Sequence, residues 1–319
     1  MVSRYAFKRI LGTVPRILLI SFLLFLLIHL PSGGPADIYA GDPSASAADI
    51  ERIRELWGLD EPLLVQYGTW LQNALTGNWG RSFAERRSVL AVVWGRLPNT
   101  LLLTGTALVL SLIVGFALGL IGALSTRRGT YNLVQGLAVF GMSIPTFWSG
   151  ALVILFFSVY LRWIPSGGMY TIGAPFSLID RISHLAAPAV VLGSVYVAQW
   201  TRYVQSGLRQ VMSEDYVRTA KAKGIGHMEA NLKHGLPNAA IPFVTVLGLE
   251  APKLISGAMV TEVVFSWPGL GRLLTDSLLA RDYPVVMGVL MVLVLVVVLA
   301  NLLTDFAYSL LDPRVRYDG

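Results

Sequence analysis

The stretch EDYVRTAKAKGIGHMEANLKHGLPNA, Glu214–Ala239, interrupts a chain that otherwise consists largely of long apolar runs. Ser213 suits the N-cap of a helix, because its hydroxyl can accept a hydrogen bond from a free backbone amide. Gly224 can end that helix through a left-handed residue, and Pro237 is expected to stop a second short helical piece and redirect the chain. The stretch therefore predicts a helix–turn–helix excursion that is too polar to enter lipid.

The rest of the chain has the composition of a membrane protein. It has 319 residues, of which 54% are hydrophobic and 14% charged, whereas soluble domains carry roughly 25% charged residues. The net charge is +6, and we attribute it to Lys and Arg in loops that set membrane topology rather than to nucleic-acid binding. The absence of cysteine excludes disulfides, thiolate chemistry and cysteine-based metal sites.

Long apolar segments predict an all-α protein with six transmembrane helices, because lipid leaves open strands with unsatisfied backbone groups. The first segment follows several basic residues and is expected to remain as an uncleaved helix rather than a signal peptide. The six segments lie at about 10–30, 99–124, 131–161, 184–205, 238–264 and 283–310.

The distribution of basic residues predicts the orientation of these helices. Lys and Arg concentrate before the first segment, in Glu214–Ala239 and after the last segment. Because short cytoplasmic loops carry an excess of these residues, both termini and Glu214–Ala239 are expected on the cytoplasmic side.

The segment between the first two crossings predicts a small extracytoplasmic helical region. SAADIERIRELWGL starts with Ser46 as a possible N-cap, and EPLLVQYGTWLQNAL has Pro62 near its start, where proline is favoured. The sequence leaves open whether this region touches a partner or only packs on its own membrane helices.

The first helix of the polar excursion carries a strip that could contact another protein. Tyr216, Val217 and Ala220 form an apolar strip, and basic residues flank it. Such a strip can press into a groove of a partner, or a basic helix can rest on anionic headgroups. The residues alone do not choose between these two interpretations.

This excursion resembles the coupling loop of permease subunits of bacterial ABC importers. DYVRTAKAKG and HGLPNA are similar to the dipeptide, oligopeptide and nickel branch, and Gly224 and Pro237 keep the family's spacing, with Leu236 before the proline. The general signature has Glu-Ala-Ala where this chain has Arg218, Thr219 and Ala220, so the glutamate is lost.

Segments along nearly the whole chain resemble the same branch in the expected order, and most closely its first permease subunit. They are RYAFKRILGTVPRILLISFLLFLLIHLPSGGPA, LWGLDEPLLVQYGTWLQNALTGNWGRS, SIPTFWSGALVILFFSVYLRWIPSGG, TEVVFSWPGLGRLLTDSLLARDYPVV and DFAYSLLDPRVRY.

The resemblance implies a type I ABC importer transmembrane fold in the bacterial plasma membrane. It implies residues 1–96 as the first helix with the extracytoplasmic segment, 97–311 as the transmembrane core with a coupling loop at about 206–238, and 312–319 as a cytoplasmic tail.

The resemblance also implies partners and a cargo. The partners are a second permease subunit in a heterodimer, two ATPase subunits that bind ATP and Mg, an extracytoplasmic substrate-binding protein and the lipid bilayer. The chain itself has no G-x-x-x-x-G-K-[ST] phosphate loop. Short peptides are the expected cargo, and nickel chelates, opines or glutathione-like molecules remain possible.

The coupling function implied by the resemblance falls on residues of the excursion. A stiff helix there would contact an ATPase subunit and transmit its nucleotide-dependent movement. The expected ATPase-coupling residues are Asp215, Tyr216, Arg218, Thr219, Ala220, Lys221, Lys223, Gly224, Leu236 and Pro237.

Other residues are candidates for the translocation path or a gate. Glu250 and Lys253 share a helical face, where they form either a pore lining or a structural ion pair, and Pro252 between them suggests a kink. Glu262 is expected to be wetted near the outer end of its helix. Pro145 is expected to kink the third crossing.

FSWPGLGRLL is a further candidate gate. Trp267 suits a membrane–water interface, and Pro268 and Gly269 break the helix. Non-helical backbone at membrane depth is tolerated where it lines a cavity or packs in protein, so the stretch is a gate, a contact for the binding protein or a plain loop.

Two other classes of protein compete with the importer permease. An ion-gradient-driven secondary transporter would favour broken helices and central charges, and Glu250 with Lys253 is the one hint of it. A membrane enzyme would show a convergent set of nucleophile, base or metal ligands, and the four histidines have no metal spacing.

Overall fold

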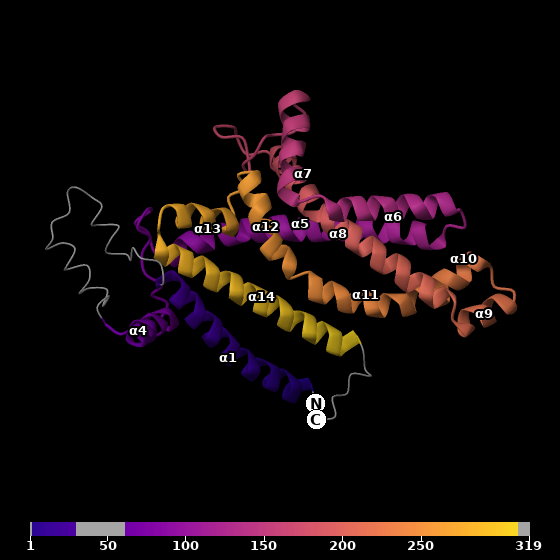
Figure 1. Ribbon diagram of the computed structural model, residues 1–319, viewed down its shortest axis with the longest axis horizontal. Coiled ribbons are helices and arrows are strands. Elements are labelled where there is room, and N and C mark those ends of the chain that lie inside the picture. The colour runs from indigo at the N-terminus through magenta and orange to yellow at the C-terminus, as the bar shows by residue number, and fades with distance from the viewer. Residues whose placement is uncertain (1, 30–60, 312–319) are drawn as a thin grey trace. The chain divides into compact units, whose positions relative to one another are not determined.

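The computed structural model describes residues 2–29 and 61–311. Regular structure in these ranges is helical, apart from one isolated antiparallel bridge between Arg81 and Ser88 (Figure 1). The helix predicted over SAADIERIRELWGL lies outside the described residues. The elements are α1 (Val2–His29), α4 (Leu63–Leu75), α5 (Val89–Leu124), α6 (Arg128–Ser143), α7 (Thr146–Val153), the π-helix η1 (Ile154–Tyr160), α8 (Leu178–Met212), α9 (Asp215–Ala222), α10 (His227–Ala230), the π-helix η2 (Asn231–Gly235), α11 (Leu236–Glu250), α12 (Lys253–Val264), α13 (Leu270–Leu279) and α14 (Tyr283–Leu311).

The chain divides into two compact units. The first unit contains residues 1–98 and 272–298, and the second contains residues 99–271 and 299–319. In the first unit, Phe25 of α1 packs with Met287 and Met291 of α14, and aromatic residues of α4 and of the segment after it join this cluster. Before α14, the Asp282 carboxylate accepts hydrogen bonds from the Ser82 hydroxyl and the Ala84 amide.

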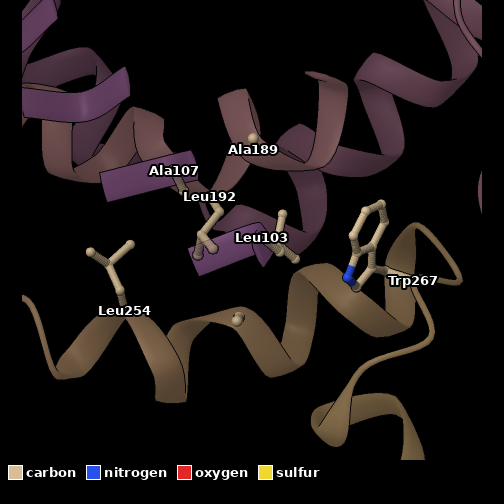
Figure 2. Packing of buried hydrophobic residues seen from close by; sticks show 7 residues of the cluster. Leu103, Ala107, Ala189, Leu192, Leu254 and Trp267 are labelled. Atoms are coloured by element: carbon tan, nitrogen blue, oxygen red, sulfur yellow. The ribbon is translucent and has the colours of Figure 1, made fainter. Parts of the chain in front are cut away.

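The core of the second unit forms where α5, α8 and α12 meet. Leu103 and Ala107 of α5, Ala189 and Leu192 of α8, Leu254 and Ala258 of α12, and Trp267 form a buried cluster (Figure 2). Small alanine side chains alternate with leucines in this cluster, which lets the three helices interdigitate. The second unit therefore brings the residues that follow α12 into the core.

A stripe of glycines brings α5 and α8 into close contact. A Cβ atom at Gly115 would lie 2.6 Å from the Trp200 Cβ, and one at Gly119 would lie 2.6 Å from the Val204 Cβ. The Thr201 hydroxyl also lies 3.3 Å from the Gly115 carbonyl. Small residues at helical spacing let two helix backbones approach in this way.

The described residues contain four helices that are long and apolar enough to cross a membrane. They are the Leu11–Ile28 part of α1, α5, α8 and the Tyr283–Asp305 part of α14. A fifth crossing is present if α6 and the helix Thr146–Tyr160 count as one bent span. The number of six predicted from the sequence is therefore not confirmed.

Two predicted crossings are broken at proline. The third crossing bends by 98° between Ser143 and Thr146, where Pro145 has extended backbone and precedes α7, so the kink predicted at this proline is confirmed. The predicted fifth crossing consists of α11 and α12, separated by Ala251 and Pro252. Proline lacks the amide hydrogen that would continue a helix.

Candidate functional site

The polar excursion forms a compact loop at the carboxyl end of α8, which we call the Gly224 loop (α9 to η2, residues 215–235). Figure 1 shows α9 and α10 beyond the end of α8. The prediction that Ser213 caps α9 is wrong. The Ser213 hydroxyl instead donates to the Gln210 carbonyl at 2.6 Å, and α9 begins with the Glu214 carbonyl, which accepts from the Val217 and Arg218 amides.

Gly224 ends α9 as the sequence predicts. Its φ is +87°, in the left-handed region that favours glycine. A Cβ atom at this position would meet nothing within 4 Å. The requirement for glycine here is therefore one of backbone conformation, not of space.

The two faces of α9 have different surroundings. Val217 and Ala220 are buried, and α9 contacts η2, α10 and the end of α8. Two members of the predicted apolar strip, Val217 and Ala220, are therefore covered by the chain itself. Tyr216 remains exposed, and the Arg218 guanidinium lies 3.4 Å from the Asp215 carboxylate at the surface.

The remaining residues predicted for coupling lie along the same loop. Thr219 and Lys223 are exposed, and the Thr219 hydroxyl donates to the Asp215 carbonyl at 2.8 Å. Asp215, Tyr216, Arg218, Thr219 and Lys223 thus form one solvent-facing surface, which we call the exposed face of α9.

Pro237 does not stop the second helical piece. Gly235 and Leu236 both have right-handed helical backbone, and Pro237 lies in the first turn of α11. The chain passes from α10 through η2 into α11 without leaving helical conformation. Proline is tolerated there because the first amides of a helix have no intrahelical partner.

The stretch after α12 forms a buried reversal, the Trp267 turn (Phe265–Gly271). Ser266 has a φ of 51°. The Trp267 indole donates to the Asn99 carbonyl at 2.9 Å, and the Asn99 side-chain amide donates to the Pro268 carbonyl at 2.8 Å. Trp267 is fully buried, so its side chain packs inside the protein, and its predicted position at a membrane interface stays a prediction.

Glu262 anchors the Trp267 turn from within. Its carboxylate accepts from the Thr100 hydroxyl at 2.6 Å and from the Gly271 amide at 2.6 Å. The Thr100 hydroxyl also accepts from the Leu270 amide at 2.8 Å. Glu262 is 0% exposed, so the prediction that it is wetted is wrong.

Two glycines of the Trp267 turn are required by space. A Cβ atom at Gly269 would collide with the Glu262 carboxylate, and one at Gly271 would collide with the backbone of Met259. The tight approach allows the Gly271 amide to reach the Glu262 carboxylate.

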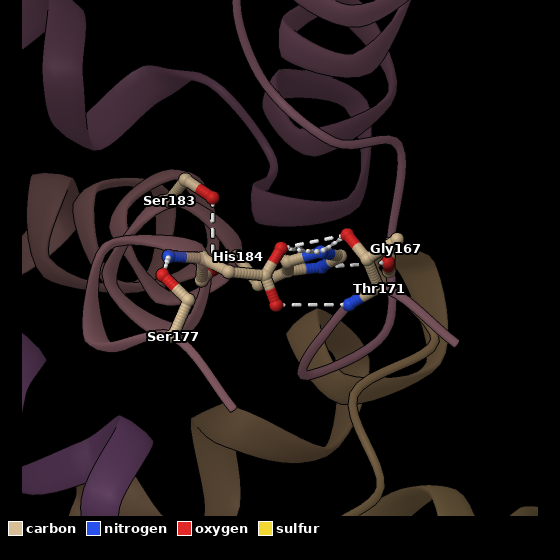
Figure 3. A network of polar contacts seen from close by, with 6 residues as sticks. Gly167, Thr171, Ser177, Ser183 and His184 are labelled. Atoms are coloured by element: carbon tan, nitrogen blue, oxygen red, sulfur yellow. Dashed lines mark hydrogen bonds and ion pairs between the residues drawn. The ribbon is translucent and has the colours of Figure 1, made fainter. Parts of the chain in front are cut away.

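A second loop, residues 161–177, packs next to the Trp267 turn. The Gly168 amide donates to the Phe265 carbonyl at 2.9 Å. His184 Nδ1 lies 3.0 Å from the Gly167 carbonyl, and the Asp180 carboxylate accepts from the Thr171 amide and hydroxyl (Figure 3). These bonds tie the loop to the first turns of α8.

Sequence reasoning missed Asn99, Thr100 and the His184 network. Ser177 followed by Asp180 is a readable signal for the start of α8, because a serine N-cap is often followed by an acid three residues on. The Ser177 hydroxyl does lie 3.4 Å from the Asp180 amide. Nothing in the local sequence marks Thr100 as the partner of Glu262.

Glu250 and Lys253 form the ion pair that their spacing predicts. The Lys253 ammonium lies 2.7 Å from the Glu250 carboxylate across the break between α11 and α12. The Lys253 side chain is 63% exposed and the Glu250 side chain 18% exposed, so this chain by itself shields only the acid.

Comparisons with known proteins cover nearly the whole chain. Residues 115–317 match the family described as binding-protein-dependent transport system inner membrane component, and residues 1–104 match the family of its N-terminal region. The oligopeptide transport system permease protein AppB of Bacillus subtilis (strain 168) is 39% identical over 320 residues, covering 99% of this chain and 100% of the relative. The glutathione transport system permease protein GsiC of Escherichia coli (strain K12) is 42% identical over 313 residues, covering 98% of this chain and 99% of the relative.

Solved structures agree on the fold. The inward-facing MetNI methionine ABC transporter superposes with a TM-score of 0.58 at 19% identity, covering 69% of this chain and 96% of that chain. An amino acid ABC transporter superposes with a TM-score of 0.52 at 15% identity, covering 71% and 95%. The family resemblance predicted from the Gly224 loop is confirmed: the chain belongs to the binding-protein-dependent transport system inner membrane components, the permease subunits of ABC importers.

Proposed function

We propose that this permease subunit forms half of a translocation path for short peptides, which an extracytoplasmic binding protein delivers. The support for this cargo comes from the relatives, whose names specify oligopeptides in one case and glutathione, itself a small peptide, in the other. A second permease subunit would form the other half of the path, and two ATPase subunits would bind ATP and Mg. The chain would then carry out transport without an ATPase site of its own.

The observation that carries the coupling mechanism is the exposed face of α9. A partner can shift a conformational equilibrium only if it contacts the two states differently, so the contact element must be stiff and accessible. α9 is stiffened on one side by its buried Val217 and Ala220, and it offers Tyr216 and Arg218 to solvent on the other side. We assign this face, together with Lys221, Gly224, Leu236 and Pro237, to the contact with an ATPase subunit.

The topology that fits this role has six crossings and both termini in the cytoplasm. α6 with α7 and η1 would form the bent third crossing, and α11 with α12 would form the broken fifth. The Gly224 loop follows the carboxyl end of α8, whereas the Trp267 turn packs on the amino-terminal half of α8 through Phe265, Ala187 and Val191. A helix of 35 residues spans about 50 Å at 1.5 Å per residue, enough to place its two ends on opposite faces of a bilayer.

The domain organisation follows from this topology. Residues 1–96 would supply the first crossing and the extracytoplasmic segment, residues 97–311 the core, and residues 312–319 a cytoplasmic tail. The Trp267 turn, with Glu262, Pro268 and Gly269, would close the outer end of the path. The breaks at Pro145 and between Glu250 and Lys253 would allow its helices to bend.

Site-specific photo-crosslinking tests the coupling assignment. Because Tyr216 is 44% exposed, benzoylphenylalanine at this position in the full complex should crosslink to an ATPase subunit, with a yield that changes between ATP-bound and nucleotide-free states. The same probe at Leu64 of α4, which is 71% exposed, is the control and should give no ATPase adduct. Crosslinking of Tyr216 to lipid alone in every nucleotide state would contradict the assignment.

A further inference from the structure

The short helix α4 presents an apolar face that the described residues of its unit leave exposed. Leu64 is 71% exposed and Leu75 is 80% exposed. At 100° per residue, Leu64, Leu71 and Leu75 fall in one narrow sector of the helix. We call this sector the Leu64 stripe.

The opposite sector of α4 is polar but uncharged. Gln66, Thr69 and Asn73 fall together on that side, Val65 and Gln72 lie between the two sectors, and α4 contains no charged side chain. A helix with one polar and one apolar side is typical of the boundary between water and lipid.

The contacts of α4 place it beside the apolar part of α1. The Tyr67 hydroxyl lies 2.8 Å from the Ser21 hydroxyl and 3.2 Å from the Leu18 carbonyl. The Tyr67 ring packs edge-on against Phe22, with ring centroids 5.1 Å apart. All three of these α1 residues lie inside the Leu11–Ile28 stretch that is apolar enough to cross a membrane.

These contacts set the depth of α4. Leu18 is ten residues before Ile28, the last residue of the apolar stretch, which corresponds to about 15 Å along the helix axis at 1.5 Å per residue. If α1 crosses the bilayer, its neighbour at Leu18 cannot lie wholly in water.

The Leu64 stripe resembles the exposed side of α1, because both surfaces consist of leucine side chains. Leu19, Leu23 and Leu27 of α1 are each more than half exposed within the chain, and on a membrane-crossing helix such residues face acyl chains. Because α4 packs on α1 at this level, leucines of the two helices meet the same surroundings.

We propose that α4 is a membrane-embedded helix whose Leu64 stripe contacts the acyl chains of the bilayer while the opposite side, with Gln66, Thr69 and Asn73, faces away from them. The occupant is the apolar part of the lipid and not an anionic headgroup, because α4 offers no positive charge. This inference requires only that the chain lies in a membrane, and it does not depend on the cargo or on ATPase coupling.

Because the chain contains no cysteine, single-cysteine spin labels can test this arrangement. The full chain with Leu64→Cys or Leu75→Cys carries a nitroxide in phosphatidylcholine nanodiscs, and Asn73→Cys on the opposite side of the same helix is the matched control. We expect collisions with oxygen to exceed collisions with a water-soluble nickel chelate several-fold at positions 64 and 75, and this ratio to be several-fold lower at position 73. Adding phosphatidylglycerol should leave these ratios unchanged.

Three outcomes would overturn the proposal. High accessibility to the nickel chelate at position 64 would place the stripe in water. Low accessibility to both reagents at positions 64 and 75 would show that protein, either a second copy or another subunit, covers it. A strong dependence on anionic lipid would show that headgroup charge holds the helix.

Discussion

The Gly224 loop and the Trp267 turn both reverse the chain, and they meet the requirement for glycine in opposite ways. At Gly224 the backbone is left-handed with φ +87° and the space around the missing Cβ is open. At Gly269 and Gly271 the space is filled by Glu262 and Met259. The first reversal therefore depends on local conformation, and the second depends on packing between distant segments.

The two reversals also differ in what surrounds them. Tyr216 and Arg218 of the Gly224 loop face solvent, whereas Phe265, Trp267 and Glu262 are all buried. We infer that the two reversals have different roles: the Trp267 turn stabilises the fold, and the Gly224 loop has a surface that a partner can contact. Substitutions should separate these roles, with the largest losses of stability in the turn and the smallest in the loop.

The largest effect is expected for Gly271→Ala. The added methyl group would overlap the Met259 backbone, which cannot move without displacing α12, and overpacking against backbone is strongly destabilising. The variant should yield little folded protein by size-exclusion chromatography in detergent. Gly257→Ala on α12 is the control, because its Cβ would meet Leu192 at an ordinary 3.6 Å. Equal yields of the two variants would show that close packing at Gly271 does not hold the Trp267 turn.

The next effect is expected at Glu262. Glu262→Ala leaves the Gly271 amide and the Thr100 hydroxyl without their carboxylate acceptor, which should lower the free energy of unfolding by roughly 3–5 kcal/mol. Glu262→Gln keeps an oxygen acceptor for Gly271 and should cost roughly 1–2 kcal/mol. Thermal unfolding in detergent measures both, and an alanine variant as stable as the wild type would show that the buried network does not hold the turn.

A smaller loss of stability but a large loss of transport is expected for Gly224→Val. A β-branched residue in the left-handed region costs about 1–3 kcal/mol, which the exposed loop can relieve only by changing the direction of the chain after α9. Peptide uptake should fall while membrane insertion is kept.

Gly226→Val is the matched control for this substitution. A Cβ atom at Gly226 would also meet nothing within 4 Å, and this glycine does not have a positive φ, so uptake should stay near wild type. Normal uptake by a correctly inserted Gly224→Val variant would contradict the coupling assignment.

The smallest effect on stability is expected on the exposed face of α9. Tyr216→Ala should change the free energy of unfolding by less than about 0.5 kcal/mol, as is usual for surface residues, but should weaken ATPase association in pull-down experiments. Val217→Ala, one residue along, removes buried methyl groups and should cost roughly 1–3 kcal/mol. If both variants lost ATPase association in proportion to stability, the two faces of α9 would not differ in role.

The contrast between local conformation and packing of distant segments also explains which features could be predicted from the sequence. The end of α9 at Gly224 could be predicted because the signal is local, and the break at Pro145 follows from one missing amide. The cap at Ser213 was wrong because α8 continues to Met212 and uses the Ser213 hydroxyl for its own last turn. A candidate cap and a helix end look alike in sequence.

The burial of Glu262 and Trp267 could not be predicted, because both depend on partners far away in the chain. Thr100 and Asn99 lie more than 160 residues before them, and the local sequence of either segment contains no sign of the pairing. The family and the Gly224 loop could be assigned because family motifs are read locally. The depth and contacts of α4 needed the structure.

The glycine stripe between α5 and α8 has a consequence for how the protein can move. The backbone of α5 at Gly115, Gly119 and Gly122 lies so close to α8 that even an added Cβ atom would collide with it. Such close packing opposes sliding or rotation of one helix against the other. We therefore expect α5 and α8 to move together as one rigid pair. Bending is expected instead at the two breaks next to proline, at 144–145 and 251–252.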